Sequence, residues 1–348
     1  MSARRLDDEA LLARIDPEGM LEKVAGFAGQ LDDALAAPLP ALPAAPSRIL
    51  LAGMGGSASS GRILAPMLEA AGSVHILVVD GYRLPAARKG DLLILCSYSG
   101  RTEEVLHLAV EGFRLPRLAI SSGGELARLA EAEGIPLLDL PAGLPPRAAL
   151  PSMLGRILAL FQAWDILTET FLDAGTLVRE LRDTTSLCRA ERPATGNPAK
   201  QAAALIEAFR PVAVSLAHEY SGAAGRLRRQ FEENASRCAQ DLNLPELHHN
   251  SWVPWMEDDE ILGAPLWLGA ADAHPRVLER RKLCEEALSD RSIPFVEIPC
   301  SGSALLNRVL TSVLIGDFIS VYLAILRGVD PSRVDPLEAV KARLNQIS

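Results

Sequence analysis

Residues 93–104 read Leu-Ile-Leu-Cys-Ser-Tyr-Ser-Gly-Arg-Thr-Glu-Glu. The apolar run that ends at Cys96 predicts a buried strand, and a helical pattern begins at Thr102. Between them, the hydroxyl side chains of Ser97 and Ser99 precede Gly100. A strand that passes through such a turn into a helix presents free backbone N–H groups and the positive end of the helix dipole. The stretch therefore predicts an α/β fold with a phosphate-binding turn.

Length, composition and charge narrow the class of protein. The chain has 348 residues, about twice the size of a common domain, so we expect two domains. A hydrophobic content of 49% with 23% charged residues is typical of a well-packed globular protein. The net charge of −9 provides no basic field for a phosphate backbone, which argues against a nucleic-acid partner.

The sequence also predicts where the protein works. Its five cysteines are scattered without a C-x-x-C pair, which indicates reduced thiols and a cytoplasmic location. Residues 1–9 lack the apolar core of a signal peptide. The most apolar helical window, 309–326, is short for a membrane span and contains Asp317. We therefore expect a buried helix there and no membrane partner.

Short apolar runs alternate with helical patterns, which predicts parallel sheets with helices on both faces. After a helical pattern over 6–37, we expect first-half strands over 48–52, 75–79, 91–96, 117–120 and 135–138, and helices over 57–71, 102–113 and 125–133. Two or three further helices are expected between 153 and 190. In the second half we expect strands over 211–216, 265–269 and 294–298, and helices over 221–238, 276–289, 303–327 and 332–344.

The second half repeats the architecture of the first. The stretch 49–62 aligns with 212–226, although the second copy has lost most of the glycines. We interpret this as a duplication in which only the first copy kept the phosphate turn. The prediction is an α/β protein with two doubly wound parallel-sheet domains in tandem. Their expected bounds are 1–165 for the domain with the phosphate turns, 166–194 for a helical connector and 195–348 for the second domain.

A glycine-rich turn accompanies the serine turn. Residues 53–61, Gly-Met-Gly-Gly-Ser-Ala-Ser-Ser-Gly, follow a predicted strand and open a helix. They match neither the dinucleotide fingerprint nor the Walker A motif, and alone they could be a tight strand-to-helix turn. Both turns follow strands of one parallel sheet, so we expect them to meet at the carboxyl edge, where open α/β sheets bind ligands.

A carboxylate and an imidazole in the second half could transfer protons. Glu233 lies late in an amphipathic helical pattern, and His249 lies in a polar loop. Each could instead be a solvated surface residue. A metal site at Glu246, His248 and His249 is a further reading, but adjacent histidines rarely face one ion and no other ligand spacing supports it.

Ser97-Tyr-Ser-Gly-Arg-Thr102 matches the Ser-x-Ser-Gly-x-Thr phosphate loop of the sugar isomerase (SIS) domain. Across nearly its whole length the chain resembles the bifunctional phosphoglucose/phosphomannose isomerase family, a branch of the phosphoglucose isomerase superfamily with two flavodoxin-like SIS domains. The stretches that carry this resemblance are 53–58, 97–104, 145–150, 233–235, 245–250 and 320–331.

The resemblance implies roles for particular residues. Glu233 would be the base, His249 would open the sugar ring from the partner subunit, Arg147 would steady the enediolate, and Lys341 would match the family's C-terminal active-site lysine. Lys341 could equally be a solvated residue of a terminal helix. The residues implied in substrate binding are Gly55, Gly56, Ser57, Ser97, Tyr98, Ser99 and Thr102. The resemblance implies a homodimer with a shared site, a sugar-phosphate substrate, and neither metal nor cofactor.

The chain departs from the family pattern around the predicted base and histidine. Glu232 replaces the usual Asn, which would tend to raise the pKa of Glu233 by repulsion. The other departures are Ser236, His248, Ser251 and Arg101.

From the resemblance we expect an isomerase acting on glucose 6-phosphate and fructose 6-phosphate, with mannose 6-phosphate as a further substrate. A non-catalytic SIS sensor and an aminosugar-phosphate isomerase remain alternatives.

Overall fold

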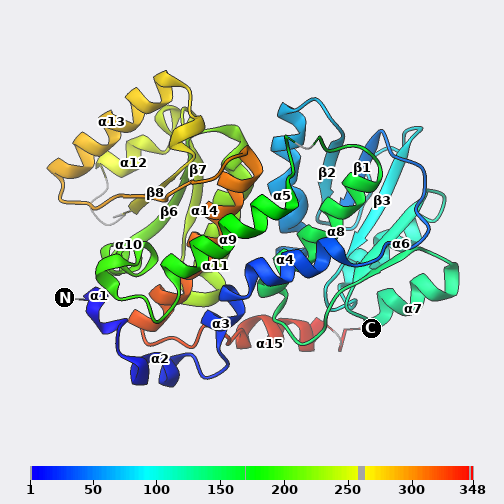
Figure 1. Cartoon of the computed structure of the whole chain (residues 1–348), viewed down its shortest axis with the longest axis horizontal. Coiled ribbons are helices and arrows are strands. Elements are labelled where there is room, and N and C mark those ends of the chain that lie inside the picture. The colour runs from blue at the N-terminus through cyan, green and yellow to red at the C-terminus, as the bar shows by residue number, and fades with distance from the viewer. Residues whose placement is uncertain (1, 169, 258–262, 345, 348) are drawn as a thin grey trace.

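The computed structural model describes residues 2–168, 170–257, 263–344 and 346–347. It contains two parallel sheets, one in each half of the chain, with helices packed between and around them (Figure 1). The predicted α/β fold is therefore confirmed.

The first sheet has five parallel strands in the order β2-β1-β3-β4-β5. Their bounds are β1 (Arg48–Ala52), β2 (His75–Val79), β3 (Asp91–Cys96), β4 (Arg117–Ser121) and β5 (Leu137–Asp139). Alternate residues of β1 and β3 pack on opposite faces of the sheet, so both strands are buried throughout. One face packs on α5 (Gly55–Ala70), and the other on α6 (Glu103–Glu111) and α7 (Gly124–Glu133).

The second sheet has the order β7-β6-β8-β9 and is also parallel. Its strands are β6 (Arg210–Ser215), β7 (Gln240–Asn243), β8 (Gly263–Leu268) and β9 (Val296–Glu297). This order repeats that of the first four strands of the first sheet, as the duplication predicts. The sequence analysis missed β7, because this edge strand is polar and largely exposed and so lacks an apolar run.

The N-terminal helical region is divided into short helices. The pattern over 6–37 forms separate helices, α2 (Glu9–Ile15), α3 (Met20–Ala25) and α4 (Phe27–Ala36), after a short α1 (Ser2–Arg5). The break after α2 follows from local chemistry. The Asp16 carboxylate accepts hydrogen bonds from the backbone N–H groups of Met20 and Leu21, at 2.7 and 2.8 Å, and Gly19 has a φ of +68°.

The remaining helices connect the two sheets or pack on the second one. They are α8 (Leu150–Ala163), α9 (Ala174–Cys188), α10 (Pro198–Ile206), α11 (Ser221–Ala235), α12 (Trp252–Glu257), α13 (Pro275–Asp290), α14 (Leu305–Leu326) and α15 (Asp335–Leu344). The sequence analysis did not anticipate α10 or α12. The domain bounds at 165 and 195 remain a prediction.

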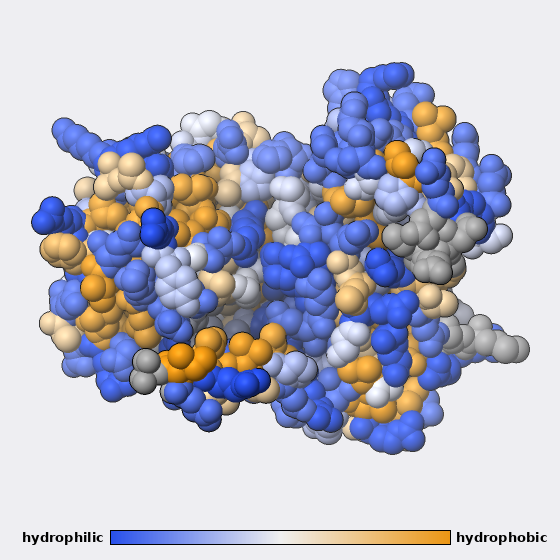
Figure 2. Space-filling model, turned by 180° about the vertical axis from the view of Figure 1, so that it is seen from behind, coloured by the Kyte–Doolittle hydropathy of each residue, from blue (hydrophilic) through white to orange (hydrophobic). Residues whose placement is uncertain are grey.

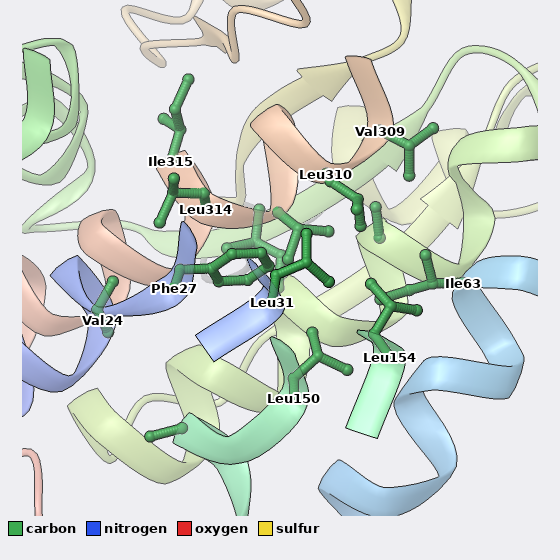
Figure 3. Close-up of a cluster of buried hydrophobic side chains, with 14 of the residues drawn as sticks. Val24, Phe27, Leu31, Ile63, Leu150, Leu154, Val309, Leu310, Leu314 and Ile315 are labelled. Atoms are coloured by element: carbon green, nitrogen blue, oxygen red, sulfur yellow. The ribbon is translucent and has the colours of Figure 1, made fainter. Parts of the chain in front are cut away.

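A single apolar core joins the two halves. The inner faces of both sheets and the helices between them form one continuous cluster, which includes Phe27 of α4, Leu154 of α8 and Leu314 of α14 (Figure 3). Separate clusters cover the outer face of each sheet. Helix α14 is long and apolar enough to span a membrane, but its most apolar window is wholly buried in this core. The site described below lies where the two halves meet on this shared core.

Candidate functional site

The two predicted turns contact each other at the carboxyl edge of the first sheet. The backbone N–H of Tyr98 donates to Ser57 Oγ at 3.2 Å. A Cβ placed on Gly53 would lie 3.2 Å from the carbonyl oxygen of Cys96, so the chain after β1 passes closely over the end of β3. The structure thus brings Gly55, Gly56 and Ser57 beside the serine turn.

The hydroxyl groups of the serine turn converge. Ser97 Oγ and Thr102 Oγ1 lie 2.8 Å apart, and Ser99 Oγ accepts the backbone N–H of Arg101 at 3.3 Å. Thr102 occupies the N-cap position of α6 without making a side-chain cap, so helix capping does not account for its hydroxyl. The first N–H groups of α6 and these hydroxyls together form a donor-rich turn suited to an anion.

Gly100 gives the serine turn its shape. Its φ is +62°, which favours glycine, and a Cβ there would lie 1.9 Å from the carbonyl oxygen of Gly123. The backbone N–H of Leu126 in α7 donates to the Gly100 carbonyl at 2.9 Å. The turn is therefore fixed against the adjacent β4–α7 connection.

Tyr98 links the serine turn to the segment that carries Arg147. Its buried hydroxyl donates to the carbonyl of Pro141 at 2.7 Å and accepts the N–H of Leu144 at 3.0 Å. Arg147 follows in the short 3₁₀ turn η1 (Pro146–Ala149). This turn lies directly on the glycine turn, because a Cβ on Gly56 would be 3.3 Å from Arg147 Cα.

Arg147 connects the first half of the chain to the predicted base. Its side chain is 4% exposed, and its Nη1 lies 3.7 Å from Glu233 Oε2. Its Nε donates to Asn234 Oδ1 at 2.7 Å and its Nη2 to the carbonyl of Pro331 at 2.6 Å. Burial lowers the pKa of Arg147, and the nearby Glu233 carboxylate partly offsets this. The guanidinium is thus held in place by α11 and by the segment that follows α14.

A buried ion pair that sequence reasoning missed supports Arg147 from behind. Arg226 of α11 binds Asp317 of α14 through two hydrogen bonds, at 3.0 and 2.6 Å, and both side chains are buried. Arg226 Nη2 also donates to the Arg147 carbonyl at 2.9 Å. Asn234 is held in turn by Ser320 of α14, at 2.9 Å. The charge of Asp317 inside an apolar helix was the one signal in the sequence for this network.

A second arginine adds positive charge near the predicted base. Arg229 lies one helical turn before Glu233 on α11, and its Nε and Nη2 are buried without a hydrogen-bond partner in the described part of the chain. Burial lowers its pKa to about 10, and the neighbouring Arg62 contributes to this shift. Arg229 therefore adds a buried positive charge on α11, one helical turn from the predicted base.

Glu232, the main departure from the family pattern, is paired. Both of its carboxylate oxygens accept hydrogen bonds from Arg228 Nη1, at 3.1 and 2.9 Å, on the surface of α11. Arg228 Nε also contacts Asp241 of β7 at 2.6 Å. The second carboxylate is therefore engaged with its own cation rather than with Arg147.

The two histidines of the polar loop have different environments. His249 lies exposed at the end of the 3₁₀ turn η4 (Glu246–His249). His248 is partly buried, with Nε2 3.0 Å from Cys284 Sγ and Nδ1 3.2 Å from Arg280 Nη1, both on α13. Burial, together with the charge of Arg280, lowers the pKa of His248. His248 therefore anchors the turn, while His249 faces outward.

Lys341 lies on an exposed helix. Its Nζ contacts Glu338 Oε1 at 2.9 Å, within α15. The same helix exposes Leu337, Val340 and Leu344, and Figure 2 shows apolar side chains on the lower edge of the molecule, where this end of the chain lies. The contacts of the described residues bring neither Lys341 nor His249 to Glu233 within one chain.

The arrangement combines an anion-binding edge with a carboxylate and a fixed guanidinium. Arg147, which contacts Glu233, lies against the glycine turn, and the glycine turn contacts the serine turn. A partly exposed carboxylate can accept a proton, and a buried cation beside it can stabilise an oxyanion. This chemistry suits proton transfer on a phosphorylated small molecule.

Two family models match parts of the chain. Residues 195–344 match the model of the bacterial phospho-glucose isomerase C-terminal SIS domain, and residues 44–114 match the SIS domain. The SIS match contains strands β1 to β3 of the first sheet, and the C-terminal match contains the whole second sheet.

Curated relatives cover most of the chain. A bifunctional phosphoglucose/phosphomannose isomerase of Aquifex aeolicus is 31% identical over 307 residues, which are 86% of this chain and 90% of the relative. The enzyme of that name from Thermoplasma acidophilum is 30% identical over 302 residues, with the same coverage of 86% and 90%. Among solved structures, a hypothetical protein from Thermus thermophilus has a TM-score of 0.75 at 17% identity, covering 99% of this chain and 93% of that one. This likeness supports the fold.

Proposed function

The chain belongs to the family of bifunctional phosphoglucose/phosphomannose isomerases, and from this premise we propose that it interconverts glucose 6-phosphate and fructose 6-phosphate, and also accepts mannose 6-phosphate. The observation that carries the proposal is the contact of Arg147 with Glu233 beside the two turns, with 3.7 Å between Nη1 and Oε2. The reaction requires no redox cofactor, because an aldose and its ketose are isomers at the same overall oxidation level, and we propose that it uses no metal.

In the proposed reaction the serine turn and Ser57 hold the phosphate of the substrate. His249, together with Lys341, opens the sugar ring, and the Glu233 carboxylate then removes the proton from C2. The resulting cis-enediolate carries negative charge, which the Arg147 guanidinium offsets. A proton passes from O2 to O1, and Glu233 delivers the proton taken from C2 to C1, which gives the ketose. Rotation about the C2–C3 bond lets one base serve both the glucose and the mannose epimer.

The base assignment is tested by Glu233→Gln, with Glu232→Gln as the matched control one residue away. Because a positioned base contributes about 10²- to 10⁴-fold, we expect Glu233→Gln to lower kcat by about that factor and to leave sugar-phosphate binding nearly unchanged. Glu232→Gln should keep kcat within a few-fold of the parent, because Glu232 is paired with Arg228. The assay starts from fructose 6-phosphate and measures both aldose phosphates. Full activity of Glu233→Gln would show that the base is wrongly assigned.

We also place the enzyme in the cytoplasm as a homodimer whose two sites each use residues from both copies. The exposed position of His249 supports this, because within one chain its contacts do not bring it to Glu233. The apolar side chains of α15 support it as well, since Leu337, Val340 and Leu344 are 49%, 58% and 50% exposed.

Mixing two inactive variants tests the shared site. Glu233→Gln and His249→Ala should each be inactive alone. In a randomised equal mixture, half of the dimers carry one copy of each variant, and such a dimer retains one intact site if His249 acts across the interface. We therefore expect about a quarter of the parent activity to return on mixing. No recovery, with mixed dimers demonstrated by differential tagging, would show that His249 does not act across the interface.

A further inference from the structure

The second sheet has a cavity of about 420 Å³ at its carboxyl edge. The residues that line it follow three neighbouring strands: Ser215–His218 and nearby residues after β6, Asn243–Pro245 after β7, and Asp272 and His274 after β8. Its size lies within the range of about 300–1,000 Å³ that is usual for small-molecule sites. The cavity belongs entirely to the second half of the chain.

The cavity occupies the position that corresponds to the proposed sugar-phosphate site. In the first sheet the two turns follow β1 and β3, the strands at which the order β2-β1-β3-β4 reverses direction. In the second sheet the strands at the same point are β6 and β8, and the cavity lies beyond their ends. The duplication has thus left a second crevice at a place where α/β sheets bind ligands.

Several polar side chains line this cavity. In the described part of the chain, the side chains of Glu219, Ser221 and Asn243 line it without making a hydrogen bond to another residue. His274 also lines it, and because its Nδ1 accepts the backbone N–H of Arg276 at 3.1 Å, Nε2 is the nitrogen left to face a ligand. Leu216, Leu244 and Val277 supply apolar walls. Apolar walls with a few free polar groups are the usual composition of a ligand site.

The charges around the cavity decide which ligand it suits. Asp272 is neutralised by Arg308, which donates hydrogen bonds at 2.9 and 2.6 Å, and it also accepts one from the Tyr220 hydroxyl at 2.7 Å. Burial alone would raise the pKa of Asp272, but these hydrogen bonds lower it, so the carboxylate stays ionised. Glu219 has no such cation among the described residues. His218 also lines the cavity, but its Nε2 lies 3.9 Å from the carboxylate oxygen Oε2 of Glu69 and so already faces a carboxylate. An anionic ligand would therefore meet an uncompensated negative charge.

We propose that this cavity is a second binding site, for an uncharged, hydroxyl-rich molecule of monosaccharide size. A carboxylate accepts hydrogen bonds from sugar hydroxyls, an imidazole N–H donates to them, and the amide and hydroxyl of the lining residues do both. The site is independent of the isomerase chemistry, because none of its lining residues belongs to the proposed active site. Its occupant contacts Pro245, the residue directly before the turn that carries His249.

The test is calorimetric titration of the full-length protein with neutral probes: D-glucose, D-mannose, D-fructose, D-mannitol and myo-inositol. Excess fructose 6-phosphate is present throughout, so that the proposed sugar-phosphate site is already filled. Asn243→Ala is compared with Gln240→Ala, a matched change on the same exposed strand outside the cavity lining. Glu219→Gln is the second cavity variant. Thermal unfolding of each variant verifies that it is folded.

At least one neutral probe should bind at one site per chain. Asn243→Ala should weaken that binding about tenfold, the loss expected for one well-placed hydrogen-bonding group, and Gln240→Ala should leave it within about twofold. The proposal is overturned if no probe binds, or if binding is insensitive to both cavity variants. Binding of inorganic phosphate or fructose 6-phosphate that these variants abolish would show that the ligand class is wrong. Titration begins after the sugar phosphates have reached equilibrium, so the heat measured is that of probe binding and the outcome does not depend on isomerase activity.

Discussion

The ion pair between Arg226 and Asp317 can be separated into a structural and a functional part by a double-mutant cycle. Removing one partner of a buried pair leaves the other charge uncompensated, which costs about 3–5 kcal/mol. Both residues here are only 3% exposed, so the single variants Arg226→Met and Asp317→Leu should each lose an amount in that range. The double variant replaces both charges by apolar groups and should recover most of the loss.

Urea unfolding followed by circular dichroism measures how much stability each variant loses. With an m-value of about 3 kcal/mol/M, the loss corresponds to a midpoint lowered by about 1–1.7 M in each single variant. The value of kcat/KM should not recover together with the stability. Both variants that contain Arg226→Met also lose the 2.9 Å hydrogen bond to the Arg147 carbonyl. Since one such bond contributes about 0.5–1.5 kcal/mol, kcat/KM should stay about two- to tenfold low even where stability is restored.

Three results would refute this reasoning. If either single variant unfolds within about 1 kcal/mol of the parent, the pair is not desolvated as its burial indicates. If the double variant is as unstable as the sum of the singles, the two residues are not energetically coupled. Full catalytic recovery in the double variant would show that Arg226 does not position Arg147.

Two further predictions concern the first sheet. Gly100→Ala should raise KM for fructose 6-phosphate at least about tenfold, because its Cβ would collide with the Gly123 carbonyl. The control is Gly72→Ala, which has a similar φ of +64° and open space around it, and which should cost about 1 kcal/mol in urea unfolding and leave KM unchanged. If the two variants have equal KM values, the serine turn does not bind the substrate. Hydrogen bonds from Arg48 lower the pKa of Asp91 in the folded protein. The ionised carboxylate therefore stabilises the fold at any pH above the pKa that Asp91 has in the unfolded chain. That stability is lost as the pH falls below about 4. Thermal unfolding of Asp91→Asn from neutral pH downward should show a shallower acid loss than the parent, and identical curves would contradict this.

The sequence predicted the parts of the fold that depend on local pattern. Strands β1 and β3 are continuous apolar runs because both faces of the sheet are covered, and a run of that kind is visible without a structure. Strand β7 has the sequence Gln-Asp-Leu-Asn and is held by pairing to β6, so nothing local marks it. The N-terminal helices kept an amphipathic pattern across their breaks, which made them look continuous.

The sequence predicted the turns of the candidate site but not the contacts that hold its side chains. The turns could be placed on one edge because parallel strands end together. The partners of Arg147 could not, since Asn234 and the Pro331 carbonyl are 87 and 184 residues away in sequence. Tyr98 was expected among the binding residues, and its hydroxyl in fact ties two backbone groups of the segment before Arg147. A contact between its backbone and the substrate stays a prediction.

The core that both halves share has a consequence for how specificity can evolve. Domains that meet through a small polar interface can swing on a hinge and close around different substrates. Here the inner faces of both sheets pack into one apolar body, so opening the seam would expose side chains such as Leu154 and Leu314 to water. We therefore expect the two halves to stay together, and discrimination between epimeric sugars to come from the side chains around Arg147 and Glu233. We expect neither half to be exchangeable alone, because each buries apolar side chains of the other in the shared core.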